Sequence, residues 1–300
     1  MKFSLKEVGN HWYKGNLHTH TIISDGSAEP SAMVKHYRDA GWDFLAITDH
    51  ARFGCYESLA SSNFLILGGV EGDVDSGRGT DHVVALGDGS WKEKHGRLFI
   101  QPDVDDKKGQ ELINRLTSEG GLTVYCHPIW SRREFAEIEN LNGFNLLEIY
   151  NHQCEYENRT GCAVHYWDSF LRQGRRIWGA AVDDSHGIGL GSLGGWVVVR
   201  TTNLSSPAVL NALENGHFYS SMGPEIFEWK ADGAQLYIAC SPVTSIHFIA
   251  YEPRGKSFHA EPGQNLSEAV YHLKGNERFV RAECQDSTGR VAWTNPIFFS

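Results

Sequence analysis

Residues 15–26 read GNLHTHTIISDG and contain two histidines two positions apart, His18 and His20. We predict a strand over residues 16–19, and side chains two positions apart on a strand project from the same face. The two imidazoles would therefore point together, as ligands of one metal ion do. A single HxH pair also occurs by chance in strands. Whether it belongs to a metal site therefore depends on whether metal-binding residue types also follow the other predicted strands.

Short apolar runs alternate with helix-like segments over residues 15–222. The predicted strands cover residues 16–19, 44–48, 64–70, 82–86, 122–126, 146–150, 177–182 and 196–200. Most of these runs are uninterrupted apolar stretches, which is typical of parallel strands covered on both faces. Four helical segments between them end at the glycines Gly41, Gly120, Gly174 and Gly216. Repeated βα units with such short connections predict an α/β fold, either a barrel or a doubly wound sheet.

The pattern changes after Pro224. Apolar and polar residues alternate over residues 280–285, and a Ser287-Thr288-Gly289 turn leads to a further run over residues 291–299. This alternation is typical of an antiparallel hairpin with one solvated face. We therefore predict two domains, an α/β domain over residues 1–223 and a small antiparallel β domain over residues 224–300.

Besides the strand of His18 and His20, residue types that bind metals follow four of the predicted strands and open a fifth. They are Asp49 and His50 after FLAIT, Glu71 after FLILGGV, His82 at the start of HVVALG, His127 after LTVYC, and Asp184 and His186 after GAAV. In a parallel barrel the carboxyl ends of all strands lie on one face, where sites are built. Any one of these residues alone is more often structural, but together they favour one shared metal cluster.

The segments LHTHTIISDG, AITDH, GVEG, DHVVALG, YCHP and DDSHG resemble, in this order, the successive motifs of the PHP (polymerase and histidinol phosphatase) superfamily of metal-dependent phosphoesterases. The resemblance implies a distorted seven-stranded βα barrel, similar to a TIM barrel, with a cluster of three divalent metal ions. The ligands that it implies are His18, His20, Glu71 and Asp184 for the first ion, Glu71 as a bridge with His82 and His127 for the second, and Asp25, His50 and His186 for the third. The segments WYKGNLHTHT, GRRIWGAAVDDSH and LENGHFYSSMGP also resemble a bacterial PHP subgroup that includes carbamate-ester hydrolases.

The implied ligands favour particular metals and a particular substrate charge. Six imidazoles and three carboxylates without a thiolate suit Zn, Mn or Fe better than Mg or Ca. Three divalent ions, these carboxylates and a bridging hydroxide leave a local charge of about +2. Such a site favours an anionic ester, and we expect a phosphoesterase that releases phosphate from a small phosphorylated metabolite or nucleotide by metal-hydroxide attack. His186 and Asp184 are the expected catalytic residues, with His186 as a candidate proton donor to the leaving group.

Other residues near the motifs are candidates for contacts with substrate. Arg52 follows the TDH motif and Arg132 follows CHPIW, and an arginine there could hold a second phosphate or a carboxylate. Asn151 ends the strand LLEIY and could line the same face. Each of the three could equally be an ordinary loop or turn residue.

Two alternative functions stay open. A carboxyl- or carbamate-ester hydrolase could use the same metal site, and a pocket without any arginine near the metals would favour it. The barrel could instead be a catalytically idle binding module, in which case a ligand should be missing. None of the implied ligands is absent from the sequence.

Composition limits the partners and the compartment. The formal net charge of −10 argues against a polymeric nucleic-acid partner, because such binding needs an excess of lysine and arginine. The six cysteines form no CxxC pair, so we expect free thiols in a reducing compartment. No apolar run has the length of a signal peptide or of a membrane span. We predict a cytoplasmic enzyme with a small-molecule substrate and no membrane partner, and the oligomeric state stays open.

Overall fold

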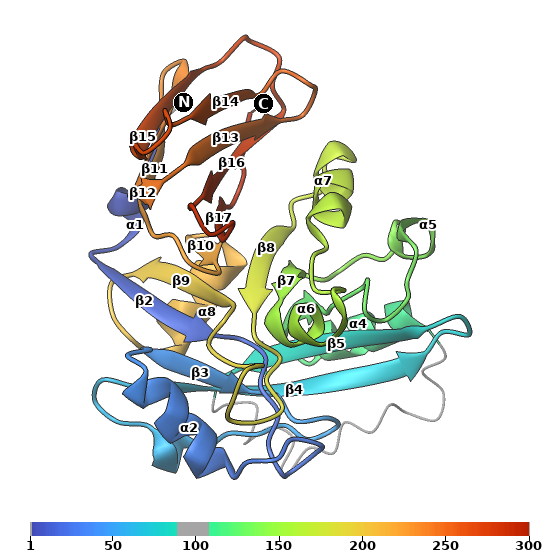
Figure 1. The fold of residues 1–300 in the computed structure, drawn as a ribbon. Coiled ribbons are helices and arrows are strands. Elements are labelled where there is room, and N and C mark those ends of the chain that lie inside the picture. The colour runs from blue at the N-terminus through green and yellow to red at the C-terminus, as the bar shows by residue number, and fades with distance from the viewer. Residues whose placement is uncertain (1, 89–107, 300) are drawn as a thin grey trace.

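The computed structural model describes residues 2–88 and 108–299. Its strands form one fourteen-stranded mixed sheet and a separate four-stranded antiparallel sheet, and helices pack along the larger sheet (Figure 1). The predicted α/β class is therefore confirmed. None of the helices in the described ranges is long and apolar enough to cross a membrane.

Seven strands of the large sheet are neighbours in chain order. They are β2 (His11–Asn16), β3 (Phe44–Ile47), β4 (Leu65–Asp75), β5 (Thr80–Gly87), β6 (Leu122–Tyr125), β7 (Leu146–Asn151) and β8 (Trp178–Val182). The segments that follow the first and the last of them meet through a parallel bridge between Thr19 and Ser185. Two hydrogen bonds flank this bridge, from His20 N to Ser185 O at 2.9 Å and from Asp184 N to His18 O at 3.0 Å. The ends of the seven-strand run therefore lie side by side at the carboxyl ends of β2 and β8.

The strand directions differ from those of a parallel barrel. β5 runs antiparallel to both β4 and β6, whereas the other pairs within β2–β8 are parallel. A short turn, closed by a hydrogen bond from Ser76 N to Gly79 O, joins β4 to β5 in a long hairpin, drawn in cyan in Figure 1. A turn this short can only connect antiparallel neighbours, since parallel strands need a crossover of a dozen residues or more. The parallel pairing expected for most of the apolar runs is therefore found in the other pairs within β2–β8 but not for β5.

The large sheet also continues beyond β2. β9 (Trp196–Thr201) pairs with β2, and the path continues through β10 (Phe218–Ser221), β17 (Val291–Thr294), β16 (Phe279–Gln285), β13 (Ser245–Ala250) and β14 (Lys256–His259), while β18 (Ile297–Phe298) pairs with β16. Strands of the first 223 residues thus share a sheet with strands of the last 77. A closed seven-stranded barrel is not confirmed by this pairing.

The four predicted helices are present as α2 (Pro30–Asp39), α4 (Gly109–Ser118), α7 (Val164–Arg172) and α8 (Ser206–Glu214). The described residues hold further short helices that the apolar spacing did not predict, namely α1 (Leu5–Val8), α5 (Phe135–Ile138) and α6 (His152–Asn158), with a short 3₁₀ helix, η1 (Glu57–Leu59). The predicted apolar faces are buried, for example Met33 of α2 and Leu112 of α4. The four glycines expected at helix ends all have φ between 70° and 92°. A residue with a side chain is strained in this left-handed region, so glycine ends these helices at low cost.

Every regular element between residues 224 and 299 is a strand, as the alternating pattern predicts. β11 (Ile226–Asp232), β12 (Gln235–Val243) and β15 (Leu266–His272) form the four-stranded sheet together with β1 (Lys2–Ser4) from the start of the chain. This sheet packs on the C-terminal strands of the large sheet around Trp229, Ile238 and Phe248. The domain boundary at residue 223 stays a prediction.

A buried ion pair joins β16 to α7. The side chain of Arg281 is 1% exposed, and its guanidinium donates to both carboxylate oxygens of Asp168, at 2.8 and 3.0 Å, and to Glu283 at 2.6 Å. Asp168 lies in α7, between β7 and β8, so this contact ties the C-terminal strands to the α/β part of the chain.

Glu277 closes the turn between β15 and β16. Its Oε1 accepts hydrogen bonds from the N–H of Lys274 at 2.7 Å and the hydroxyl of Tyr271 at 2.8 Å, and its Oε2 accepts one from the N–H of Gly275 at 2.9 Å. Burial by itself would raise the pKa of Glu277, but these hydrogen bonds outweigh burial and lower the pKa to about 2.

Glu277→Gln is expected to lower the free energy of unfolding by about 1–3 kcal/mol at pH 7, because one amide oxygen cannot accept all three bonds. The folded-state pKa lies below the ordinary value of 4.5, so the carboxylate stabilises the fold above pH 4.5 and this contribution is lost as the pH falls toward 2. Urea unfolding of both proteins should show a difference at pH 7 that shrinks by about pH 3. The exposed Glu261→Gln is the control, and an equal difference at both pH values would contradict the explanation.

Candidate metal centre

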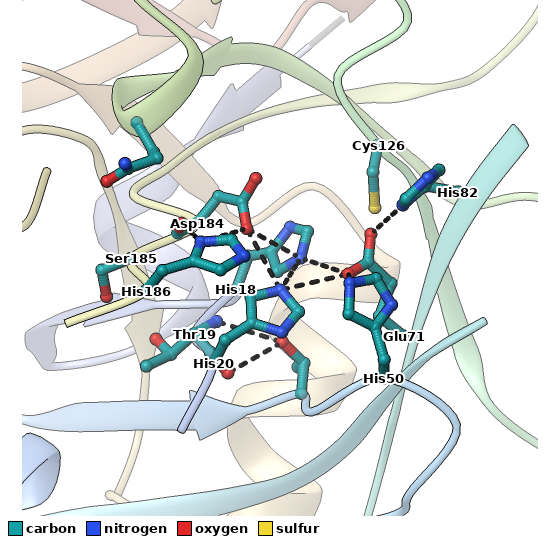
Figure 2. Close-up of polar contacts among 12 residues, drawn as sticks. His18, Thr19, His20, His50, Glu71, His82, Cys126, Asp184, Ser185 and His186 are labelled. Atoms are coloured by element: carbon teal, nitrogen blue, oxygen red, sulfur yellow. Dashed lines mark hydrogen bonds and ion pairs between the residues drawn. The ribbon is translucent and has the colours of Figure 1, made fainter. Parts of the chain in front are cut away.

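All nine implied ligands lie in one cluster, and most of them are in segments that follow a strand. Figure 2 shows seven of them: His18, His20, His50, Glu71, His82, Asp184 and His186. His18 and His20 follow β2, Asp25 lies between β2 and α2, His50 follows β3, Glu71 lies in β4, His82 in β5, His127 follows β6, and Asp184 and His186 follow β8. Six separate stretches of the chain therefore deliver side chains to one place. That these residues bind metal ions stays a prediction. The distances between their ligand atoms show whether they could surround an ion.

Glu71 is at the centre of the cluster. Its Oε2 lies 3.1 Å from Nε2 of both His18 and His20 and 3.3 Å from Nε2 of His50. Its Oε1 lies 2.8 Å from Nδ1 of His82 and 3.4 Å from Nε2 of His127. A single buried carboxylate thus faces five imidazoles, which is the arrangement expected of a carboxylate that bridges two ions.

The first implied group has the dimensions of a metal site. Nε2 of His18 and Nε2 of His20 are 3.1 Å apart, and Asp184 Oδ1 lies 3.3 and 3.2 Å from them. Together with Glu71 Oε2, these atoms surround one point at nearly equal spacings. The corners of a tetrahedron around a zinc ion with bonds of about 2.0 Å are about 3.3 Å apart. The buried Asp184 Oδ1 also has no hydrogen-bond partner, so the four atoms fit a divalent ion.

The second implied group is brought together, whereas the third converges with His20 in place of His50. Glu71, His82 and His127 form one set of converging ligand atoms, and His20, Asp25 and His186 form another. Asp25 Oδ2 lies 3.4 Å from His186 Nε2 and 3.7 Å from His50 Nε2. The groups overlap at His20 and Glu71, so the number of ions and the division of ligands among them stay predictions.

The electrostatics of the cluster also call for cations. Burial disfavours the charged form of His20, but the facing carboxylates of Asp184 and Glu71 outweigh burial and raise its pKa to about 9. Burial would raise the pKa of Glu71, yet the facing imidazoles, His18 first, hold that pKa well below its ordinary value. The buried carboxylates therefore need positive charge beside them, which divalent ions supply in place of protons.

The backbone at the strand ends is held in unusual conformations. His127 and Asp184 have φ values of 21° and 57°, and Ala51, directly after His50, has φ of 56°. Positive φ in residues with a side chain costs of order 1–3 kcal/mol and is concentrated at functional sites. The fold thus sets the direction of these side chains at a local cost in strain.

Asp49 fixes the loop that carries His20 and Asp25. Its Oδ1 accepts hydrogen bonds from the N–H of Thr21 at 2.7 Å and the hydroxyl of Ser24 at 2.9 Å, and its Oδ2 accepts one from the hydroxyl of Thr21 at 2.8 Å. The TDH and HTHT segments are therefore joined to each other, and the aspartate of TDH has a structural role beside the ligands.

A cavity of about 260 Å³ opens over the cluster. Its lining holds eight of the nine implied ligands, all except His18, together with Trp130, Gln153, Cys154 and Glu157. The Trp130 ring packs edge-on against His127 and His82, with centroid distances of 5.0 and 5.7 Å. Among the lining residues that the structure describes there is no arginine and no lysine.

The residues predicted to contact substrate do not line the cavity, in contrast to most of the implied ligands. Arg52 and Arg132 are exposed and do not line the cavity, so their role stays a prediction. The next residue after Arg132, Arg133, is buried, and its Nε lies 3.1 Å from Oδ1 of Asp81. Asn151 is fully buried, and its amide donates to Glu148 at 2.9 Å and to Asp184 at 3.1 Å. This position does not support a contact between Asn151 and a substrate, because both amide hydrogens are already used.

Sequence reasoning missed Glu148. This residue lies within the buried strand β7 and is 1% exposed, and its Oε1 lies 2.6 Å from Nδ1 of His18. The signal was a charged residue inside the apolar run LLEIY, where an unpaired carboxylate would be costly.

No family model and no curated protein matches this sequence. Among solved structures, a two-domain protein from Bacteroides vulgatus that contains a predicted PHP-like metal-dependent phosphoesterase matches with a TM-score of 0.53 and 13% identity, over 96% of this chain and 95% of that chain. At this identity the likeness shows the fold alone, and that fold agrees with the resemblance that the motifs carry.

Two further solved structures match at TM-scores below 0.5, and no argument rests on them. An amidohydrolase from Chromobacterium violaceum, with bound sulfate and no metal, matches at 0.43 with 18% identity, over 58% of this chain and 88% of that one. A putative metal-dependent phosphoesterase from Bifidobacterium adolescentis matches at 0.40 with 14% identity, over 60% and 89%.

Proposed function

We propose that this chain is a metal-dependent hydrolase of the PHP superfamily that cleaves phosphate esters of small molecules. The observation that supports it most strongly is the convergence of His18, His20, Glu71 and Asp184 at spacings suited to a divalent ion. The other implied ligands surround this group, and a cavity gives access to it. A site with three ions, Zn, Mn or Fe, in the ring of strands β2–β8 is the arrangement that we infer.

In this proposal the ions and the surrounding side chains have separate roles in hydrolysis. Bound divalent ions would supply a water of lowered pKa, near 7, and would polarise the ester. Glu71 would hold the ions at a fixed separation, because it presents one oxygen to each side of the cluster. The hydrogen bond from Asn151 would orient the carboxylate of Asp184 toward the first ion. His186 is partly exposed and lines the cavity, so its Nε2 would be placed to give a proton to the leaving oxygen where that nitrogen does not bind an ion.

The charge of the site supports an anionic ester. Three divalent ions, three ligand carboxylates and a hydroxide leave about +2. The phosphoesterase named for the Bacteroides vulgatus structure is in line with this assignment. Glu157 in the cavity lining would reduce the positive charge, so a substrate with one phosphate fits better than one with several.

A second candidate is a carboxyl- or carbamate-ester hydrolase on the same metal site. The observation that favours it is the absence of arginine and lysine from the described part of the cavity lining. A site that binds phosphate esters usually adds such a group to its metals, since guanidinium pairs with phosphate oxygens. A neutral ester needs no such partner.

Turnover measurements separate the two candidates. Metal-free protein is reloaded with Zn²⁺, Mn²⁺ or Fe²⁺ and incubated with phosphate monoesters, nucleotides, and carboxyl and carbamate esters. We expect phosphate release, which Asp184→Asn should abolish and so exclude a contaminating phosphatase. Turnover of neutral esters alone would select the second candidate, and a protein that takes up no metal and cleaves no ester would be an idle binding module.

A small-molecule substrate, the absence of nucleic-acid and membrane partners, and a cytoplasmic location are parts of this proposal that rest on the sequence. The oligomeric state stays open.

A further inference from the structure

β7 differs from the other strands of the β2–β8 run because it contributes none of the implied ligands. It contributes instead two fully buried polar residues, Glu148 and Asn151, directly behind the cluster. Neither lines the cavity, so neither is placed to meet a substrate.

Glu148 receives three hydrogen bonds from two sides of the cluster. Its Oε1 lies 2.6 Å from Nδ1 of His18. Its Oε2 accepts from the backbone N–H of His127 and from Nδ2 of Asn151, both at 2.9 Å. Asn151 donates in turn to Asp184 Oδ2 at 3.1 Å. The pair Glu148 and Asn151 therefore touches three of the implied ligands.

The contact between Glu148 and His18 is a hydrogen bond rather than shared ligation of an ion. His18, Cys126, His127 and Glu148 also form a set of closely spaced potential ligands. Two ligands of one ion with bonds of about 2.0–2.1 Å lie about 2.8–3.4 Å apart. The 2.6 Å separation is shorter than that range and suits an N–H that donates to a carboxylate.

We infer that Glu148 is a positioning residue of the metal centre, which fixes His18 with its proton on Nδ1 and its Nε2 lone pair toward Glu71 and Asp184. The inference rests on the proposed metal site. A carboxylate behind a ligand histidine fixes the ring orientation and raises the basicity of the ligand nitrogen. The bond to the N–H of His127 also holds that strand end, where φ is 21°.

Glu148→Gln tests this role. Both oxygens of Glu148 accept hydrogen bonds, so an amide has to turn its NH₂ toward one of the donors. We expect Zn²⁺ to bind about 10–100-fold more weakly to the variant. Binding is measured by competition with a zinc-sensitive chromogenic chelator, and urea unfolding of the metal-free proteins is measured alongside. Glu277→Gln is the matched control, since it also removes a buried carboxylate but lies outside the cluster, and it should leave Zn²⁺ affinity unchanged.

A second measurement needs no variant. In Zn²⁺-loaded wild-type protein, ¹⁵N NMR should show a protonated Nδ1 on His18. An unprotonated Nδ1, or Zn²⁺ affinity of Glu148→Gln within about twofold of the wild type, would overturn the inference. A wild-type protein that binds Zn²⁺ but hydrolyses no ester would contradict the proposed function and leave the comparison of affinities valid.

Discussion

Glu71→Gln is expected to lower ester turnover by about 10³-fold or more. Glu71 faces five imidazoles with its two oxygens, and an amide would present an NH₂ group to one side of the cluster. Loss of an ion removes several kcal/mol of transition-state stabilisation, and about 4 kcal/mol corresponds to a factor of about 10³ in rate. Metal content by elemental analysis and kcat/KM on the best ester substrate measure the effect.

Asp73→Asn is the matched control for this variant. Asp73 lies two residues further along β4, and its Oδ1 is 3.5 Å from Nδ1 of His50, on the side of the ring away from Glu71. This substitution should keep the metal content and cost about tenfold in rate, the low end of the usual range, because the side chain of Asp73 is 44% exposed. Full metal content and wild-type activity in Glu71→Gln would contradict the bridging role of Glu71.

Arg281→Met is expected to lower the free energy of unfolding by about 3–5 kcal/mol, because it leaves the carboxylate of Asp168 buried without its partner. Both oxygens of Asp168 accept hydrogen bonds from the guanidinium, and the side chain of Arg281 is 1% exposed. Urea unfolding of the metal-free protein measures the change without any contribution from bound ions.

The double variant Arg281→Met with Asp168→Leu provides the control. Replacing both members of a buried ion pair by apolar residues is often close to neutral, so the second substitution should recover part of the lost stability. If Arg281→Met alone unfolds at the same urea concentration as the wild type, the ion pair does not hold β16 to α7.

The sequence carries enough information to place the ligands but not to pair the strands. His50, His127 and Asp184 could be placed because each directly follows a buried apolar run, and the ends of such runs meet in space. The helix ends could be placed because glycine tolerates positive φ. The antiparallel direction of β5 depends on the turn Ser76-Gly77-Arg78-Gly79, and the apolar runs on either side of it carry no information on strand direction.

The residues behind the ligands were harder to predict, for a physical reason. Glu148 and Asn151 act through partners that are distant in the chain, and His18 is 130 positions away from Glu148. Spacing along one strand contains no information about such contacts. A carboxylate in an apolar run indicates only that some partner exists. The place of Asn151 at the end of β7 leaves both the open face and an ordinary turn as alternatives, and in the structure its amide points inward to Asp184.

The bridge between Thr19 and Ser185 has a consequence for the order in which the protein is made. It brings Thr19, three residues after β2, against Ser185, three residues after β8, so the two sides of the first implied group can meet only after residue 185 has left the ribosome. An ion held by both ends would act as a cross-link that closes a very long loop, and cross-links of this kind restrict the unfolded chain most. Loss of such an ion should therefore lower the stability of the fold.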